Sequence, residues 1–207
     1  MVDYGIGNLY SVRRALESCD AVVKFASDAD GVRDADYLVL PGVGAFSNGM
    51  QGLQERGLIE PVRQYAADGR PMLGICLGMQ MLATSSDEFG NSSGLNLISG
   101  RVVAIPAMTV QGTQHKIPHI GWAGLESTPT ASWSATPLAD TVPGTAVYLL
   151  HSFHVVPDNP AHILADCRYG GHRVTAAIRS ARIFGCQFHP EKSGVAGLKI
   201  LSAFLDC

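Results

Sequence analysis

Apolar residues in the first half of the chain gather in short continuous runs, and stretches with helical spacing separate these runs. A short apolar run bounded by turn residues is typical of a strand buried on both faces. Four such runs predict strands, at residues 2–4, 21–25, 37–40 and 71–76. Three intervening stretches predict helices, at residues 9–19, 50–65 and 78–84. This alternation predicts an α/β fold with a mostly parallel central sheet and helices on both faces.

Single residues refine the predicted helices. Asn8 stands immediately before the helical pattern of residues 9–19 and is of a type preferred at the N-cap. Gly57 and Pro61 interrupt residues 50–65, so we expect two shorter helices there. Ser193 is placed to cap a last amphipathic helix that ends near Leu205.

The second half of the chain is richer in strands. Turn signals at residues 157–160 and at Gly170-Gly171 separate the apolar runs. Six runs predict strands, at residues 102–105, 117–120, 147–150, 162–167, 174–178 and 183–188. They predict an antiparallel extension of the sheet. Because no linker or internal repeat interrupts the pattern, we expect residues 1–207 to form one domain.

Composition and charge exclude several classes of function. The 207 residues are 46% hydrophobic and 16% charged, as expected for a folded globular protein. A formal net charge of -3 without any run of Lys or Arg gives no support to a nucleic-acid groove. No apolar segment could span a bilayer, and residues 1–4 lack the regions of a secretory signal. We expect a cytoplasmic protein with no nucleic-acid or membrane partner.

The cysteines give no sign of a disulfide framework or a zinc site. There are five of them, an odd number, and no two have C-x-x-C spacing, which favours a reducing compartment. His151 and His154 are three apart, and on a strand they would face opposite ways, so joint metal binding is disfavoured. We expect no metal and no organic cofactor.

Cys76 differs from the other cysteines in its setting. It lies at the centre of residues 74–78 (GICLG), between a predicted strand and a predicted helix, as the nucleophile does in a nucleophile elbow. The sharp turn needs Gly74 and Gly78 because larger side chains would clash. Nearby helical N–H groups would favour a thiolate, and the N–H of Leu77 would face a developing oxyanion. A buried cysteine between packing glycines is the alternative interpretation.

His189 and Glu191 are the candidate base and its orienting acid. They follow a predicted strand, and residues two apart on an extended chain point the same way. Glu191 could then accept a hydrogen bond from the imidazole and fix its tautomer. An ordinary α/β-hydrolase fits poorly, because its acid precedes the histidine in sequence.

These residues resemble the class I, or triad-type, glutamine amidotransferases, and most closely the glutaminase subunits of imidazole glycerol phosphate synthases. The resemblance runs nearly from end to end. Five motifs carry it, at residues 3–9 (DYGIGNL), 41–46 (PGVGAF), 74–80 (GICLGMQ), 118–122 (PHIGW) and 187–194 (QFHPEKSG).

The resemblance implies a reaction and a set of site residues. Cys76 would attack the side-chain amide of glutamine, giving a thioester and ammonia, and water would release glutamate. His189 would move the protons, with Glu191 as its orienter. The N–H groups of Val43 and Leu77 would form the oxyanion hole, and whether residues 42–44 must first flip is left open. The substrate-binding residues would be Gly44, Gln80 and Glu88, with the main chain at Ser152 and Phe153.

The resemblance also implies a partner. Ammonia would pass through a tunnel into a (βα)₈-barrel synthase subunit, and the heterodimer would form imidazole glycerol phosphate in histidine biosynthesis. Residues near Trp122 and at 151–154 would face this partner.

Several features depart from the subfamily's pattern and keep alternatives open. Only two residues precede Asp3, so either the start is truncated or the first strand is short. Ala123 stands where asparagine is common, Phe153-His154 stands where a tyrosine is usual, and residues 107–114 differ. The alternatives are a glutaminase subunit for a sugar-amidating synthetase of surface polysaccharides, a catalytically silent docking subunit and a cysteine hydrolase acting on esters.

Overall fold

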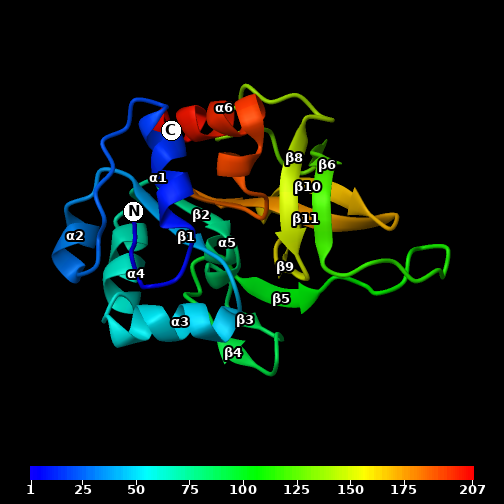
Figure 1. Cartoon of the computed structure of the whole chain (residues 1–207), viewed down its shortest axis with the longest axis horizontal. Coiled ribbons are helices and arrows are strands. Elements are labelled where there is room, and N and C mark those ends of the chain that lie inside the picture. Colours follow the sequence, from blue (N-terminus) through cyan, green and yellow to red (C-terminus); the bar gives the residue numbers. More distant parts are fainter.

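Parallel strands of the two chain halves form the centre of the computed structural model, which describes all residues from 1 to 207 (Figure 1). The middle strand β2 (Met72–Cys76) pairs in parallel with β1 (Leu38–Gly42) and with β12 (Ile183–Cys186). The sheet continues through β11 (His172–Ser180), β10 (Ile163–Tyr169) and β7 (Glu126–Ser127), all antiparallel.

The α/β class and the antiparallel extension are confirmed. The strand order is β1-β2-β12-β11-β10-β7, with two parallel and three antiparallel pairings. The six-stranded sheet is therefore mixed rather than mostly parallel, because the extension is as long as the parallel part.

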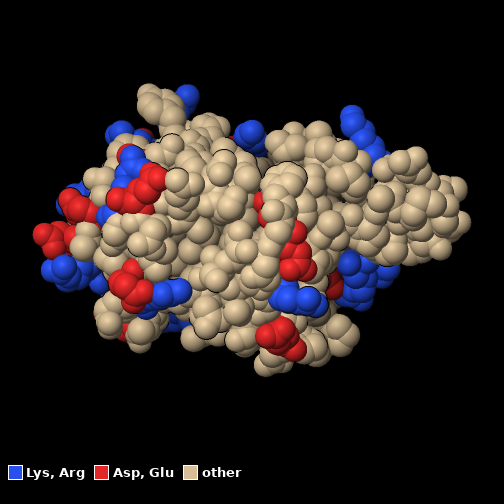
Figure 2. All heavy atoms as spheres, turned by 90° about the horizontal axis from the view of Figure 1, so that it is seen from below, with Lys and Arg blue, Asp and Glu red and all other residues tan.

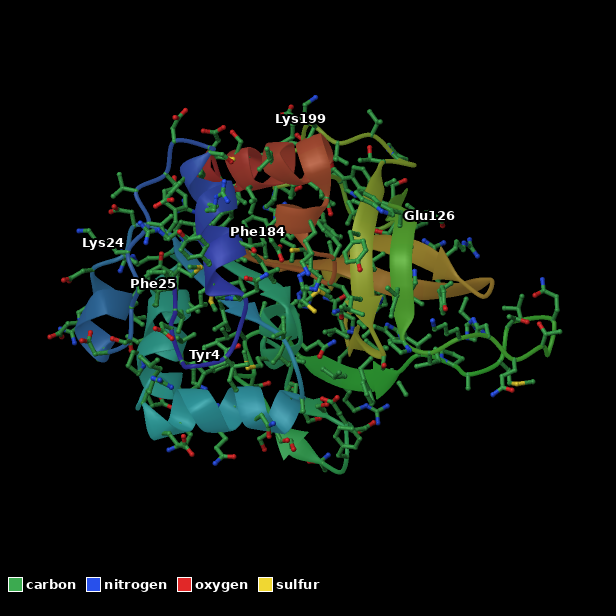
Figure 3. All side chains as sticks on the ribbon, in the orientation of Figure 1. Tyr4, Lys24, Phe25, Glu126, Phe184 and Lys199 are labelled. Atoms are coloured by element: carbon green, nitrogen blue, oxygen red, sulfur yellow. The ribbon has the colours of Figure 1, made fainter.

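Helices cover both faces of the sheet. Alternating strand residues point to opposite faces, so Val39 packs in the same apolar cluster as α1 and α6, and Leu40 in that of α3, α4 and α5. Figure 1 shows α1 and α6 on one side, with α3 and α4 on the other. Phe184 lies between the sheet and α6, edge-on to Phe204 (Figure 3). The helices are α1 (Leu9–Glu17), α2 (Ala29–Arg33), α3 (Phe46–Glu55), α4 (Ile59–Ala67), α5 (Leu77–Met81) and α6 (Gly194–Leu205).

Two smaller sheets lie beside the main one. β6 (His119–Gly124) and β8 (Ala146–His151) form an antiparallel pair. The other sheet has the order β4-β3-β5-β9, and its bounds are β3 (Ser85–Ser86), β4 (Ser92–Ser93), β5 (Gly100–Ala104) and β9 (Phe153–Pro157). Two 3₁₀ turns complete the chain, η1 (Pro160–His162) and η2 (Pro190–Lys192).

The helix signals in the sequence have clear counterparts. The Asn8 side chain accepts a hydrogen bond from the N–H of Ser11, so Asn8 caps α1 as predicted. The break between α3 and α4 falls at Gly57, whose φ of 64° suits glycine. Pro61 lies in the first turn of α4, where a missing N–H costs nothing.

The strand predicted at residues 21–25 is wrong. These residues have no regular structure, and Val22 is 89% exposed. Its link to the N-terminus is short: the Met1 amino group donates to the carbonyl oxygen of Lys24, and the next residue but one, Ala26, donates to Met1 and accepts from the N–H of Asp3. The apolar run therefore lacks a neighbour long enough to make a strand ladder. Val2, predicted within a strand, forms only an isolated bridge to Ala26. β9 was not predicted.

On the face shown in Figure 2, Lys and Arg side chains are interspersed with Asp and Glu. None of the helices combines the length and the apolar character needed to cross a membrane.

Candidate active site

Cys76 lies at a sharp turn between β2 and α5. Its backbone has φ 54° and ψ -110°, a left-handed conformation that residues with a side chain rarely adopt. A Cβ at Gly74 would lie 2.7 Å from the backbone of Gly78, and a Cβ at Gly78 would overlap the carbonyl oxygen of Leu40. The glycines therefore let α5 pass directly against β1 and β2. This is the geometry of a nucleophile elbow.

His189 and Glu191 form a buried pair. Nδ1 of His189 lies 2.8 Å from Oε1 of Glu191, and the two side chains are only 5% and 1% exposed. The strand expected to extend to residue 188 ends at Cys186, and Glu191 lies in the 3₁₀ turn η2. The two side chains thus meet through a turn rather than through the alternation of a strand.

The backbone of His189 is held by strand β8. Its N–H donates to the carbonyl oxygen of Tyr148 over 2.9 Å. The Ser193 hydroxyl donates to the carbonyl oxygen of His189 and accepts from the N–H of Tyr148. Ser193 occupies the N-cap position of α6 as predicted, but its hydroxyl makes these contacts instead of capping the helix.

The imidazole of His189 also interacts with Cys76, so the three predicted triad residues lie together. Burial lowers the pKa of His189, but hydrogen bonds and charge interactions with Cys76 and Glu191 outweigh burial and raise this pKa to about 9. An imidazole between a thiol and a carboxylate can remove a proton from the sulfur and deliver it to a leaving group.

The predicted oxyanion segment lies against the elbow. Gly42 is opposite Cys76 in the parallel register of β1 and β2. A Cβ at Gly42 would lie 3.0 Å from Cβ of Leu77 and would overlap the Tyr4 hydroxyl, so this approach also requires glycine. Val43 is 41% exposed, and Gly44 has φ 93°. The structure thus brings Gly42, the first residue of the predicted oxyanion segment, next to Leu77.

The predicted substrate-binding residues Gln80, Glu88 and Ser152 each make a hydrogen bond within the chain. Gln80 is buried, and its Nε2 donates to the carbonyl oxygen of Phe153 over 3.1 Å. Oε2 of Glu88 accepts from the N–H of Phe46 over 2.6 Å, which ties this carboxylate to the end of the oxyanion segment. The carbonyl oxygen of Ser152 accepts from the N–H of Ile105, the residue that follows β5.

Comparison with known families decides which chemistry this site belongs to. The family model described as "Glutamine amidotransferase class-I" matches residues 1–206. The chain belongs to this family. Two similar relatives of the amidotransferase are imidazole glycerol phosphate synthase subunits HisH 1 of Legionella pneumophila (strain Paris) and HisH of Geobacillus sp. (strain WCH70). The first is 50% identical over 207 residues, covering 100% of this chain and 97% of the relative. The second is 43% identical over 204 residues, covering 99% and 94%.

Solved structures share the fold of the amidotransferase at low identity. One described as "Crystal structure of glutamine amidotransferase" has a TM-score of 0.73 and 17% identity, covering 99% of this chain and 96% of that chain. Another, of PurLQS from Thermotoga maritima, has a TM-score of 0.72 and 18% identity, covering 99% and 95%. The sequence-based assignment to the class I family and fold is confirmed.

Gln187 is a residue of the amidotransferase site that sequence patterns did not point to. Its side chain is fully buried, and its Nε2 donates to Sγ of Cys76 over 3.7 Å. The only signal was its place in the motif of residues 187–194, two positions before His189. No group of three or more His, Cys, Asp or Glu side chains is arranged to hold a metal ion.

The raised pKa of His189 predicts the pH dependence of the amidotransferase. The folded-state pKa of about 9 exceeds the ordinary value of 6.5. The stabilisation of the folded protein by protonated His189 is therefore complete below pH 6.5 and is lost as pH rises through about 9. With His189 as the predicted general acid, its protonated form would supply the proton of the leaving group, so kcat/KM for glutamine is expected to fall above about pH 9. Initial rates of glutamate release between about pH 6 and 10 would measure this fall.

Glu191→Gln supplies the comparison for this pH profile. Glutamine retains the size of the side chain but removes the negative charge that helps to raise the His189 pKa. The alkaline fall in kcat/KM is therefore expected at lower pH in this variant, together with a loss of about 10²-fold or more in kcat. An alkaline fall at the same pH in both proteins would contradict the assignment of this limb to His189.

Proposed function

We propose that this amidotransferase is the glutaminase subunit of an imidazole glycerol phosphate synthase, that it acts in the cytoplasm in histidine biosynthesis, and that residues 1–207 form one glutaminase domain. The buried His189–Glu191 pair beside Cys76 is the observation that carries the glutaminase chemistry. The full-length identity to two synthase subunits supports the pathway. It favours the histidine pathway over the sugar-amidating alternative.

The proposed reaction uses the site in two half-reactions. Sγ of Cys76 attacks the side-chain carbonyl carbon of glutamine, and the oxyanion is stabilised by the N–H groups of Val43 and Leu77. His189 gives its proton to the amide nitrogen, so the C–N bond breaks and ammonia leaves a thioester. His189 then takes a proton from water, whose oxygen attacks the thioester carbon. The C–S bond breaks, so glutamate leaves and the sulfur departs as a thiolate, while His189 keeps the proton taken from water for the next cycle.

In this proposal Glu191 orients the base and Glu88 joins substrate binding to the oxyanion segment. Glu191 accepts at Nδ1 of His189, which leaves Nε2 to face the sulfur. Glu88, Gln80, Gly44 and the main chain at residues 152–153 would hold the backbone groups of glutamine. Since Glu88 is bonded to the N–H of Phe46 in the free chain, a substrate ammonium group would compete for the same carboxylate.

The outer face of the β6–β8 pair suits a partner subunit. Ile120, Trp122 and Leu150 are exposed there, with Trp122 at 58%. Ile120 and Leu150 are opposite each other in the register, and Trp122 lies edge-on to Tyr148. The main chain of β8 also borders the nucleophile, since the carbonyl oxygen of Leu150 lies 4.0 Å from Sγ of Cys76. An apolar face only one strand away from the nucleophile is where a partner would receive ammonia.

The deciding experiment measures glutamate release from glutamine. The chain alone is compared with the chain plus a (βα)₈-barrel synthase subunit of the histidine pathway and its phosphoribosyl ligand. We expect low basal activity and strong activation by the partner. No activation, with a glutamine-directed label still reacting at Cys76, would reject the histidine pathway and favour a sugar-amidating synthetase. No turnover and no labelling would favour a silent docking subunit.

Trp122→Ala is expected to weaken activation by the barrel subunit. Loss of a large exposed aromatic from the centre of the proposed interface would raise the partner concentration for half-maximal activation by about 10-fold or more. Phe25→Ala is the matched control, because Phe25 is also partly exposed but lies far from β6 and β8 (Figure 3). Equal activation curves for Trp122→Ala, Phe25→Ala and the unchanged chain would place the interface elsewhere.

A further inference from the structure

Gln187 contacts the nucleophile, although no pattern in the sequence gives this residue a role. Its Nε2 lies 3.7 Å from Sγ of Cys76, and its side chain has no exposure to solvent. A buried amide that donates to sulfur interacts more strongly with a thiolate than with a thiol, since a donor stabilises the charged acceptor.

The orientation of the Gln187 amide follows from the carbonyl oxygen of Phe153, to which it is linked through the side chain of Gln80. The oxygen of Phe153 can only accept, so the Gln80 atom facing it over 3.1 Å must be Nε2. The same Nε2 lies 3.0 Å from Gln187 and donates there as well, which makes the facing atom of Gln187 its Oε1. The remaining atom, Nε2 of Gln187, therefore faces the sulfur as a donor.

His151 holds the start of this chain in place. Its Nδ1 lies 2.8 Å from the same Phe153 oxygen, so Nδ1 carries a hydrogen. Burial lowers the pKa of His151 to about 3, although the bond to Phe153 opposes this effect. The ring is therefore neutral at the pH of catalysis, and its tautomer does not change when the protonation of His189 does.

We infer that Gln187 is a positioning residue, whose amide holds Sγ of Cys76 as a thiolate directed at the substrate. This role rests on the proposed function of the site. His189 supplies the cationic partner of the sulfur, and Gln187 supplies a neutral donor whose direction is set by Gln80 and Phe153. Because Gln80 is also a proposed substrate-binding residue, the same amide chain links the glutamine pocket to the nucleophile.

Gln187→Met tests the role directly. Methionine has a similar length but no N–H donor. The rate of alkylation of Cys76 by iodoacetamide is measured against pH in the full chain, with the Cys76 peptide resolved by mass spectrometry. Loss of one hydrogen bond to a charged acceptor is expected to move the midpoint of this curve up by about one pH unit. At pH values below the midpoint, alkylation is then expected to be about 10-fold slower. We also expect kcat to fall and KM to stay nearly constant.

Gln80→Met keeps the inference testable if Gln187→Met fails to fold. This variant retains Gln187 but removes the group that orients its amide, so a smaller shift in the same direction is expected. An unchanged alkylation curve in a folded Gln187→Met or Gln80→Met protein, even with reduced stability, would overturn the positioning role. Alkylation needs neither glutamine nor a partner. A failure of the proposed glutaminase function would instead appear as absent turnover in the unchanged chain.

Discussion

Cys76→Ala is expected to reduce glutamine hydrolysis by about 10⁴-fold or more, to the level of background. Alanine leaves no atom that can form the thioester, and the water that His189 would activate in the second half-reaction then has no thioester to attack. The fold and the apolar face at Trp122 do not depend on the sulfur. Binding of the barrel subunit is therefore expected to persist in the variant.

The measurement is glutamate release at saturating partner, with Cys19→Ala as the control. Cys19 is a partly buried cysteine just after the C-terminal end of α1, with its thiol on the carbonyl oxygen of Leu198, and its loss is expected to leave turnover unchanged. A diazo-ketone analogue of glutamine is expected to label Cys76 alone. Cys167 cannot compete, because burial raises the pKa of its thiol to about 12. Turnover well above background in Cys76→Ala, or label on Cys19 or Cys167, would reject Cys76 as the nucleophile.

The elbow could be predicted from the sequence because its requirements are local. A nucleophile on a sharp strand-to-helix turn needs small residues on both sides, and this requirement appears directly as Gly74 and Gly78. The structure gives the reason, since neither position has room for a Cβ. The same holds for the helix signals at Asn8 and Gly57, where a cap and a left-handed turn depend on neighbouring residues only.

Other parts of the structure depend on partners that are distant in sequence. Residues 21–25 have the composition of a buried strand, but no long neighbouring strand lies beside them. The Ser193 hydroxyl binds the backbone of β8 rather than its own helix. Gln187 and Gln80 are 107 residues apart, and the direction of both amides follows from the oxygen of Phe153. No local pattern could predict these contacts.

Strand β8 links the proposed catalytic residues to the proposed partner face. The carbonyl oxygen of Tyr148 holds the N–H of His189, and the oxygen of Leu150 lies near Sγ of Cys76. The Leu150 side chain belongs to the exposed outer face. β8 therefore contacts the proposed base and the proposed nucleophile, and it also carries the exposed apolar surface. A partner bound to that surface would contact the strand that positions His189.

Gly78→Ala is expected to destabilise the protein by about 3 kcal/mol or more, even though alanine is the better helix former by about 1 kcal/mol. The added Cβ would overlap the carbonyl oxygen of Leu40, and neither β1 nor α5 can move away without opening the buried core beside them.

Gly49→Ala in α3 is the matched control for this substitution. Its added Cβ would lie 2.7 Å from Sδ of Met81, the flexible end of a side chain that can adopt another rotamer. Its stability is expected within about 1 kcal/mol of the unchanged chain, because the gain in helix propensity offsets the repacking. Equilibrium urea unfolding measures both. Similar unfolding midpoints for the two variants would mean that the elbow tolerates a side chain at Gly78, and that close approach to β1 is not what places Cys76.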